Sequence, residues 1–292
     1  MNNLIVYDLN SADVHEFDVP DAMVQEWHRT RDILVKVLEF EIIYDQVIEA
    51  YWAYKNQVNY WNLRSVSRPF SDYINNHEIR SSLNRLAFNL LNLSKLYLDW
   101  HFNKDKSRCF ASEITDDEST KKEVDSQRKH IYESNLNYVI GCKLRGHSQH
   151  SALPVSSFTT GLRYAQETRA KTVHFSIYYY HDDLDKIGVP KGRIHRDIKL
   201  DLTDILDGYI FAISEMHMLN RKLTEAVVFQ AQTKFLDLWE NQISQTGYSS
   251  YRCEIYTNDQ IFYQSLDWFK VFDYLKTKHS SAIDYAALIF TK

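Results

Sequence analysis

Residues 33–61 read ILVKVLEFEIIYDQVIEAYWAYKNQVNYW and carry the strongest periodic signal of the chain. Apolar side chains recur there every three or four positions, at Ile33, Val37, Phe40, Tyr44, Val47, Tyr51, Tyr54, Val58 and Trp61. This spacing places them on one face of an α-helix. A helix with such an unbroken apolar seam buries it against other helices of the same chain or against a second copy of itself. The stretch therefore predicts either a helical bundle or a dimer.

Flanking residues indicate where this helix begins and ends. Asp18 followed by Pro20 suits a helix start, because a carboxylate caps free N–H groups and proline fits the first turn. The sequence Ser67-Arg68-Pro69 predicts a turn after the helix. The β-prone run Leu4–Tyr7 predicts a short strand before it.

Two more helices are expected before residue 155. The first covers 72–102, and a polar stretch from 103 to about 122 reads as an exposed connection. Thr115 and Glu118 have the spacing of a capping box, which predicts the start of a third long helix. Pro154 ends that helix.

The second half of the chain mixes strand and helix patterns. Apolar and polar side chains alternate over 173–180 and again over 198–202, which predicts a hairpin. A long helix is expected from about Thr203 to Ile243, with Gly247 as its stop. The remaining elements are a strand over 251–256 and a short helix over 265–277.

These elements predict a mainly α fold, α+β overall. We expect a helical bundle domain over residues 1–160 and a mixed α/β region over residues 161–292, which holds the hairpin and the long helix. The two regions either form separate domains or pack as one unit.

Composition narrows the classes of function. The chain has 292 residues, 44% of them hydrophobic and 25% charged, which is ordinary globular usage and enough for a substantial core. Its net charge of −5 excludes a general nucleic-acid coat, so any RNA would be held by a local patch. No glycine-rich phosphate loop, HExxH or nucleophile elbow occurs, and we expect no metal and no cofactor.

The cysteines and the apolar runs bear on where the protein works. Cys109, Cys142 and Cys253 are scattered and form no CxxC, which argues against a disulfide framework and suits a reducing compartment. The N-terminus shows no secretory pattern, and no apolar run approaches the ~20 residues of a membrane span. We therefore expect a cytoplasmic protein without membrane association.

The string from Leu144 to Pro154 holds the residues with the clearest chemistry. Arg145 and His150 are separated by four residues near the end of the third predicted helix. Arginine supplies a fixed charge for phosphoryl oxygens, and histidine moves a proton near neutral pH. The pair therefore suits work on a phosphodiester. Arg169 and His174 repeat the spacing, but in a segment that alternates like a strand.

This spacing resembles the Arg-x4-6-His signature of the HEPN family, small helical domains that include many metal-independent ribonucleases. The resemblance implies a helical bundle, a homodimer that brings two motifs together, Arg145 and His150 as catalytic residues, and an RNA substrate. The family often has Asn, Asp or His directly after the arginine, where this chain has Gly146, and His147 is the candidate replacement one position further on.

Helix geometry constrains this candidate site. Five positions on an ideal helix rotate by about 140°, so Arg145 and His150 do not share a face of a regular helix. Three arrangements remain open: Gly146 loosens the turn, His150 lies beyond the helix end, or a second protomer completes the site.

A basic cluster follows the predicted strands. Lys191, Arg193, Arg196 and Lys199 either form a solvated surface or contact RNA phosphates. Tyr178-Tyr179-Tyr180 either packs as a half-buried strand or offers rings for base stacking. His217 is interpreted as a core or boundary histidine.

Two functional hypotheses follow from these residues. The first is a metal-independent endoribonuclease of HEPN type, acting as a toxin or as an antiviral defence effector, with a cognate antitoxin or regulatory partner. The second is a non-catalytic, HEPN-like dimeric protein for binding or interaction. Cleavage of RNA in EDTA distinguishes them.

Overall fold

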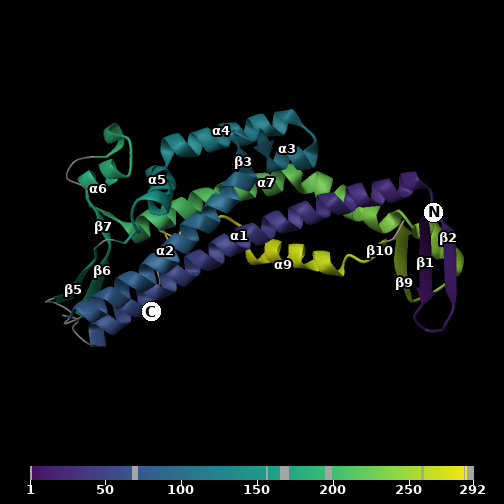
Figure 1. The fold of residues 1–292 in the computed structure, drawn as a ribbon, viewed down its shortest axis with the longest axis horizontal. Helices are drawn as coiled ribbons and strands as arrows, with labels where there is room; N and C mark the ends of the chain where they lie inside the picture. The colour runs from purple at the N-terminus through teal and green to yellow at the C-terminus, as the bar shows by residue number, and fades with distance from the viewer. Residues whose placement is uncertain are drawn as a thin grey trace. The chain divides into compact units, whose positions relative to one another are not determined.

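The protein is mainly helical with small antiparallel sheets, so the expected mainly α, α+β class is confirmed (Figure 1). The computed structural model describes residues 2–67, 72–155, 157–164, 171–194, 199–257, 260–285 and 287. The helices are α1 Asp21–Ser67, α2 Tyr73–His101, α3 Phe110–Thr115, α4 Glu118–Ser134, α5 Leu136–His150, α6 His181–Lys186, α7 Leu202–Asp237, α8 Glu240–Thr246 and α9 Lys270–Lys278, with 3₁₀ turns η1 Lys191–Arg193 and η2 Asp267–Phe269. The strands are β1 Asn2–Asp8, β2 Val14–Asp18, β3 Phe102–Asn103, β4 Arg108–Cys109, β5 Thr159–Tyr164, β6 Lys171–Ser176, β7 Tyr178–Tyr179, β8 Leu200–Asp201, β9 Tyr251–Thr257 and β10 Gln260–Tyr263.

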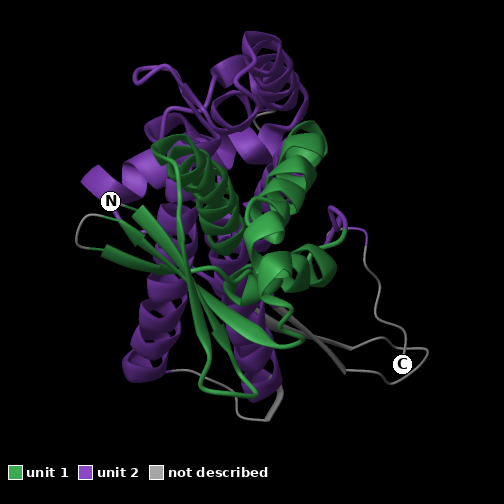
Figure 2. Ribbon diagram, turned by 90° about the vertical axis from the view of Figure 1, so that its right-hand side faces the viewer, with its two compact units in different colours: residues 1–42, 222–280 green, residues 43–221, 281–292 purple. Residues whose placement is uncertain are grey.

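The chain divides into two compact units, coloured separately in Figure 2. Unit 1 comprises residues 1–42 and 222–280, and unit 2 comprises residues 43–221 and 281–292. The boundary expected after residue 160 falls inside unit 2. The division points at residues 42 and 221 lie within α1 and α7, so each of these helices contributes to both units.

Unit 1 is built around a four-stranded antiparallel sheet in the order β10-β9-β1-β2. One face of β1 is fully buried at Leu4 and Val6, which lie opposite Ile255 and Cys253 of β9. Trp27 of α1 is also fully buried, and its indole nitrogen donates a 2.6 Å hydrogen bond to Gln264. The sheet therefore gains a helical cover on one side, as an antiparallel sheet with one apolar face requires.

Unit 2 is a helical bundle that buries the seam of α1. From Tyr44 to Trp61, the part of the seam in unit 2, every seam residue is buried. Within unit 2, α2 runs alongside α1, where the indole of Trp61 donates to Ser82 of α2 at 2.9 Å. Tyr51 donates to Asp207 of α7 at 2.7 Å. The sequence left open whether the seam packs within a bundle or against a second copy. In unit 2, the seam packs within a bundle of the same chain.

The expected third long helix is two helices. The capping-box interpretation of Thr115 and Glu118 is wrong, because Thr115 ends the short α3 and Asp117 caps α4 by accepting from the backbone of Ser119 at 2.8 Å. The helix then stops at Asn135, whose side-chain oxygen accepts from the backbone N–H of Tyr138 at 3.0 Å and caps α5. Asparagine favours such a cap because its side chain competes for backbone partners.

In the second half, the expected strand over 173–180 is divided into β6 and β7. Strand β7 pairs with β8, whereas β6 pairs with β5, a strand that the sequence did not indicate. The residues from His181 to Asp185 lie in α6. The long helix ends at Asp237 and is followed by α8, which stops at Gly247 with a left-handed φ of 68°.

Candidate functional site

The C-terminal part of α5 carries the residues that the sequence singled out. Because Asn135 caps its start, α5 runs from Leu136 to His150 and includes Gly146 within its regular course. A Cβ at Gly146 would meet nothing within 4 Å, so no close contact requires glycine there. The backbone N–H of Ser151 closes the last turn on the carbonyl of His147 at 2.8 Å.

This geometry excludes two of the three arrangements of the motif. Gly146 does not interrupt the helix, and His150 lies within its last turn. Arg145 and His150 are therefore about 140° apart around α5. His147 and His150, three positions apart, share a face. One copy of the chain thus brings together the two histidines, but not the arginine with either of them.

The two imidazoles lie at an accessible end of α5. His150 is exposed and His147 is half-buried. Between them, the amide of Gln149 donates to Asn92 of α2 at 2.8 Å and ties this end of α5 to α2. The face with the histidines therefore has a fixed position on the bundle and access to solvent.

Arg145 faces a different environment, formed by buried hydroxyl and thiol groups. Burial raises the pKa values of Tyr138, Cys142 and Tyr209, and the positive charge of Arg145 partly opposes each increase. The Nε of Arg145 is buried and makes no hydrogen bond within the described part of the chain. The guanidinium group is thus half-buried beside α7, where Tyr209 lies.

A close helix contact creates this environment. A Cβ at Gly141 would lie 2.5 Å from the ring of Tyr209, so glycine is required for the approach of α5 to α7. Tyr138 and Tyr209 stack with ring centroids 5.7 Å apart. The inward face of α5 is therefore tightly packed, in contrast to the open surface at Gly146.

The predicted basic cluster does not form one site. Arg193 donates to the carbonyls of Tyr132 at 2.6 Å and Glu133 at 3.2 Å, and so binds the C-terminal end of α4. Lys191 is 82% exposed and lies 3.4 Å from the carboxylate of Asp185. Arg196 lies outside the described residues.

Lys199 lies in a different place, beside two tyrosines. Its ammonium group is 4.7 Å from the ring centre of Tyr178 and 5.1 Å from that of Tyr180, within the range of cation–π attraction. Lys199 and Tyr178 both line a groove of about 390 Å³ between α1, the strands β6 to β8 and the start of α7. This groove unites a predicted RNA-binding lysine with a predicted stacking residue.

The other side of this groove is a polar stripe of α1 that the sequence interpretation missed. Lys55, Asn59 and Asn62 line it at positions i, i+4 and i+7. Lys55 is held by Asp207, with its ammonium group 2.8 Å and 2.9 Å from the two carboxylate oxygens. The helical spacing of these polar residues beside the apolar seam could have indicated a groove wall. An ordinary solvated helix face has the same pattern, so the sequence does not distinguish the two.

His217 is a core residue, as interpreted from the sequence. It is fully buried and stacks on Tyr44 with ring centroids 3.8 Å apart.

No three His, Cys, Asp or Glu side chains in the described part of the chain are grouped so that they could hold a metal ion. No helix among the described residues is long and apolar enough to span a bilayer.

Comparison of the chain with protein-family models, with curated proteins and with solved structures found no match.

Proposed function

We propose that the protein is a metal-independent endoribonuclease of HEPN type, with its site at the C-terminal end of α5. The observation that carries this proposal is the pair of imidazoles, His147 and His150, on one accessible face of a fixed helix end. Cleavage of RNA by its own 2′-hydroxyl needs one group to accept a proton and another to donate one. Two histidines on one face supply both.

The proposed reaction assigns a role to each side chain. His150 accepts the proton of the 2′-hydroxyl, whose oxygen attacks the phosphorus, while His147 donates a proton to the 5′-oxygen as the P–O5′ bond breaks. The products are a 2′,3′-cyclic phosphate and a free 5′-hydroxyl. A guanidinium group stabilises the charged phosphorane through paired hydrogen bonds.

In this proposal, Arg145 of a second copy completes the site. Arg145 lies about 140° from His150 on its own α5, so a homodimer is needed to place a guanidinium group near both imidazoles. Leu96 and Leu153, 44% and 59% exposed, lie within four residues of the Asn92–Gln149 hydrogen bond that ties α5 to α2. They support a dimer contact in this area, because exposed apolar groups favour association.

The groove at Lys199 is the proposed contact for the RNA strand outside the cleavage site. Its lysine would contact a phosphate and Tyr178 would stack on a base. Lys191, Arg193 and Arg196 are proposed only as peripheral phosphate contacts, since Arg193 already binds two carbonyl groups. We further propose a cytoplasmic toxin or antiviral effector restrained by a cognate antitoxin or regulatory partner.

The test is cleavage of end-labelled RNA in EDTA by the full chain. We expect products with a 2′,3′-cyclic phosphate, no cleavage of DNA of the same sequence, and a loss of about 10²–10⁴-fold in His147→Ala and His150→Ala. Arg145→Lys should also lose most activity, because lysine lacks the planar fork. His77→Ala, which removes an exposed histidine of α2, serves as the matched control.

Two results would overturn this proposal. One is undiminished cleavage by folded His150→Ala, and the other is cleavage that requires Mg²⁺. Light scattering that gives a monomer at tens of micromolar would overturn the composite site.

The second candidate is a non-catalytic dimeric binding protein. The observation that favours it is the half-buried position of Arg145 beside Tyr209. In this case Arg145 stabilises the packing of α5 and takes no part in catalysis. Absence of cleavage by the wild type, together with a dimer by light scattering and a lowered unfolding midpoint in Arg145→Ala, would favour this candidate over the ribonuclease.

A further inference from the structure

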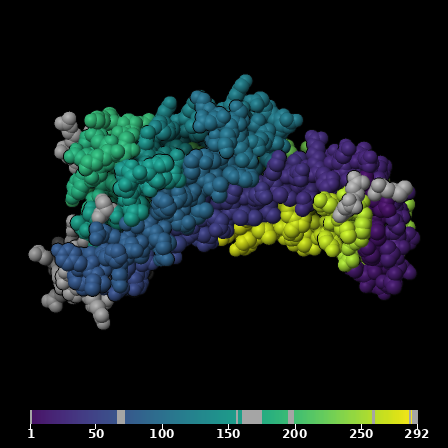
Figure 3. Space-filling view, viewed as in Figure 1, coloured from purple at the N-terminus to yellow at the C-terminus, as the bar shows by residue number. Residues whose placement is uncertain are grey.

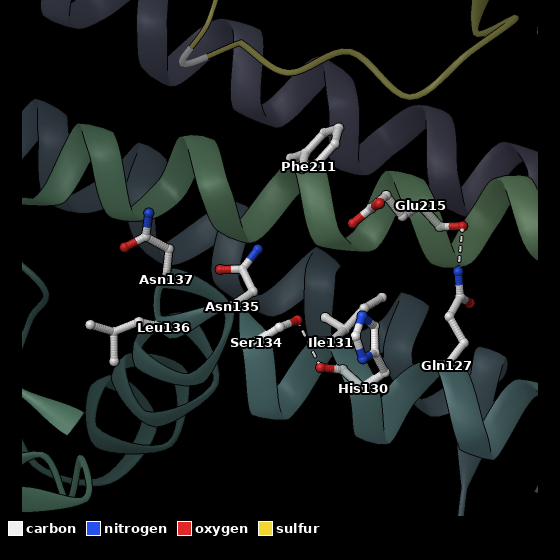
Figure 4. Close-up of a pocket in the computed structure, with 9 residues that line it drawn as sticks. All are labelled: Gln127, His130, Ile131, Ser134, Asn135, Leu136, Asn137, Phe211 and Glu215. Carbon is white, nitrogen blue, oxygen red and sulfur yellow. Dashed lines mark hydrogen bonds between the residues drawn. The ribbon is translucent and has the colours of Figure 1, made fainter. Parts of the chain in front are cut away.

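A second groove lies within unit 2, between the α4–α5 junction and α7. It has a volume of about 440 Å³, which is within the usual range for small-molecule sites. Figure 4 shows the nine residues that line it, which are Gln127, His130, Ile131, Ser134, Asn135, Leu136, Asn137, Phe211 and Glu215. The side chains of α4, teal in Figure 3, form an uncovered surface on the face viewed there.

Three side-chain amides fix the walls of this groove. Each donates to a backbone carbonyl of α7 at 3.2 Å: Gln127 to Glu215, Asn135 to Gly208, and Asn137 to Asp204. A carbonyl oxygen only accepts hydrogen bonds, so the NH₂ group of each amide must face α7. One N–H of each amide is therefore used on the protein itself, and the second N–H of each remains.

Few other donors remain for a ligand. The hydroxyl of Ser134 donates to the carbonyl of His130 at 2.8 Å, and the amide oxygen of Asn135 is occupied as the cap of α5. Apart from the second N–H of each amide, the imidazole of His130 is the remaining side-chain donor among the nine residues. Acceptors remain as well, because the amide oxygen of Asn137 makes no hydrogen bond within the described residues.

The strongest of these acceptors is the carboxylate of Glu215. Figure 4 shows it projecting between Phe211 and His130. It forms no ion pair or hydrogen bond within the described part of the chain. Burial raises its pKa, and the negative charge of Asp284 raises it further, while His130 opposes the increase. The groove thus holds a partly desolvated carboxylate that forms no ion pair within the described residues.

From these groups we infer that the groove binds a small organic cation, an alkylguanidinium or alkylammonium group. Its N–H groups bind the Glu215 carboxylate, and its hydrocarbon stem contacts Ile131, Leu136 and Phe211. An aromatic ring beside the charge adds cation–π attraction. A hydrated divalent metal ion prefers several oxygen ligands and gains nothing from apolar walls. The inference is independent of RNA cleavage.

The test uses butylguanidinium as the probe and NMR of the ¹³C-labelled methyl groups of Ile131 and Leu136 as the readout. We expect these methyl signals to shift with a Kd of about 1 mM, a value within reach of so small a ligand. Butylurea, which has the same shape but no charge, should bind more than about 10-fold more weakly, because it cannot neutralise the carboxylate. Guanidinium without the butyl chain should also bind more weakly.

Variants separate the groove from general charge effects. Glu215→Gln keeps the shape and should weaken binding of butylguanidinium by about 10-fold or more, while Glu123→Gln, which removes an exposed carboxylate of α4, should leave it unchanged. Equal affinity of Glu215→Gln and wild type, equal binding of butylurea, the same shifts with MgCl₂ alone, or no methyl shift at all would each overturn the inference. Thermal unfolding of each variant confirms that it folds.

Discussion

Glu215 and His217 lie two residues apart on α7 and face two different environments. His217 is fully buried, stacks on Tyr44, and lies 3.4 Å from the hydroxyl of Tyr97. Glu215 is partly exposed in the groove, and its carboxylate forms no bond within the described residues. About 200° of helical rotation separates the two side chains. One titratable group is therefore part of the core, and the other is available to a ligand.

On both sides of α7, the partners of a polar group determine whether it contributes to stability or to binding. On the core side, His101 is fully buried and contacts the amide of Asn220 at 2.8 Å, which keeps the neutral imidazole in place. Loss of such a group leaves a cavity and an unpaired partner. On the groove side, solvent replaces whatever is removed. We therefore expect substitutions on the core side to change stability, and substitutions on the groove side to change binding.

The largest expected effect is the pH dependence of stability from His101. Burial lowers its pKa from 6.5 to about 3, so the unfolded chain binds a proton at a higher pH than the folded chain. The contribution is complete above pH 6.5 and is lost as the pH falls towards 3, by up to about 5 kcal/mol. Urea unfolding of wild type and His101→Gln between pH 7 and pH 4 measures the difference. An identical pH dependence in both proteins would show that the buried imidazole of His101 does not cause it.

The next effect is the removal of the buried ring of His217. We expect His217→Ala to lower the free energy of unfolding by about 3 kcal/mol, because it leaves a cavity beside Tyr44. His130→Ala removes the same side chain from the exposed surface of α4 and should cost no more than about 0.5 kcal/mol. Equal losses in the two variants, measured by urea unfolding, would show that burial does not separate the two faces.

Two glycines of α5, Gly141 and Gly146, also differ in whether they lie on a packed or an open face. Gly141→Ala should cost about 1–3 kcal/mol, because the added Cβ would lie 2.5 Å from the ring of Tyr209. Gly146→Ala should instead stabilise the protein by up to about 1 kcal/mol, since alanine favours a helix and finds open space there. Thermal unfolding of both variants measures this difference. A Gly141→Ala variant as stable as wild type would contradict the prediction.

The smallest expected effect is that of Glu215→Gln on stability. Burial raises the pKa of Glu215, so the folded chain binds a proton more readily than the unfolded chain, and the charged form slightly destabilises the fold at neutral pH. Glu215→Gln should change the free energy of unfolding by at most about 0.5 kcal/mol at pH 7, as a stabilisation that vanishes below pH 4.5. A loss above 2 kcal/mol, roughly the cost of breaking a buried contact, would place Glu215 with the core residues.

The sequence predicted those elements whose signals are local. The seam of α1 repeats every three or four residues, and Asp72 and Gly247 mark helix ends through their own side-chain or backbone chemistry. The break at Asn135 was missed, because an asparagine within an apolar pattern is also compatible with a continuous helix. The structure shows the cap, in which the side-chain oxygen of Asn135 accepts from the backbone N–H of Tyr138, while its amide nitrogen donates to Gly208 of α7.

The groove at Glu215 could not be predicted from the sequence for a related reason. Gln127, Asn137 and Glu215 lie on three helices and are brought together only by packing. Each looks like an ordinary surface residue in its own segment. Arg145 and His150, and their angular separation on a regular helix, could be read from the sequence, while the uninterrupted course of α5 through Gly146 required the structure.

The pairing of β1 with β9 has a consequence for how the chain folds during synthesis. Asn2 lies opposite Thr257 in this sheet, so about 250 residues must be made before the pairing can form. At a translation rate of about 5–20 residues per second, the first strand waits for roughly 12 to 50 seconds. During this time the edge of β1 that β9 will occupy is open to other strands. A ribosome-bound chain that stops before residue 251 should therefore be prone to aggregation at the hairpin of β1 and β2.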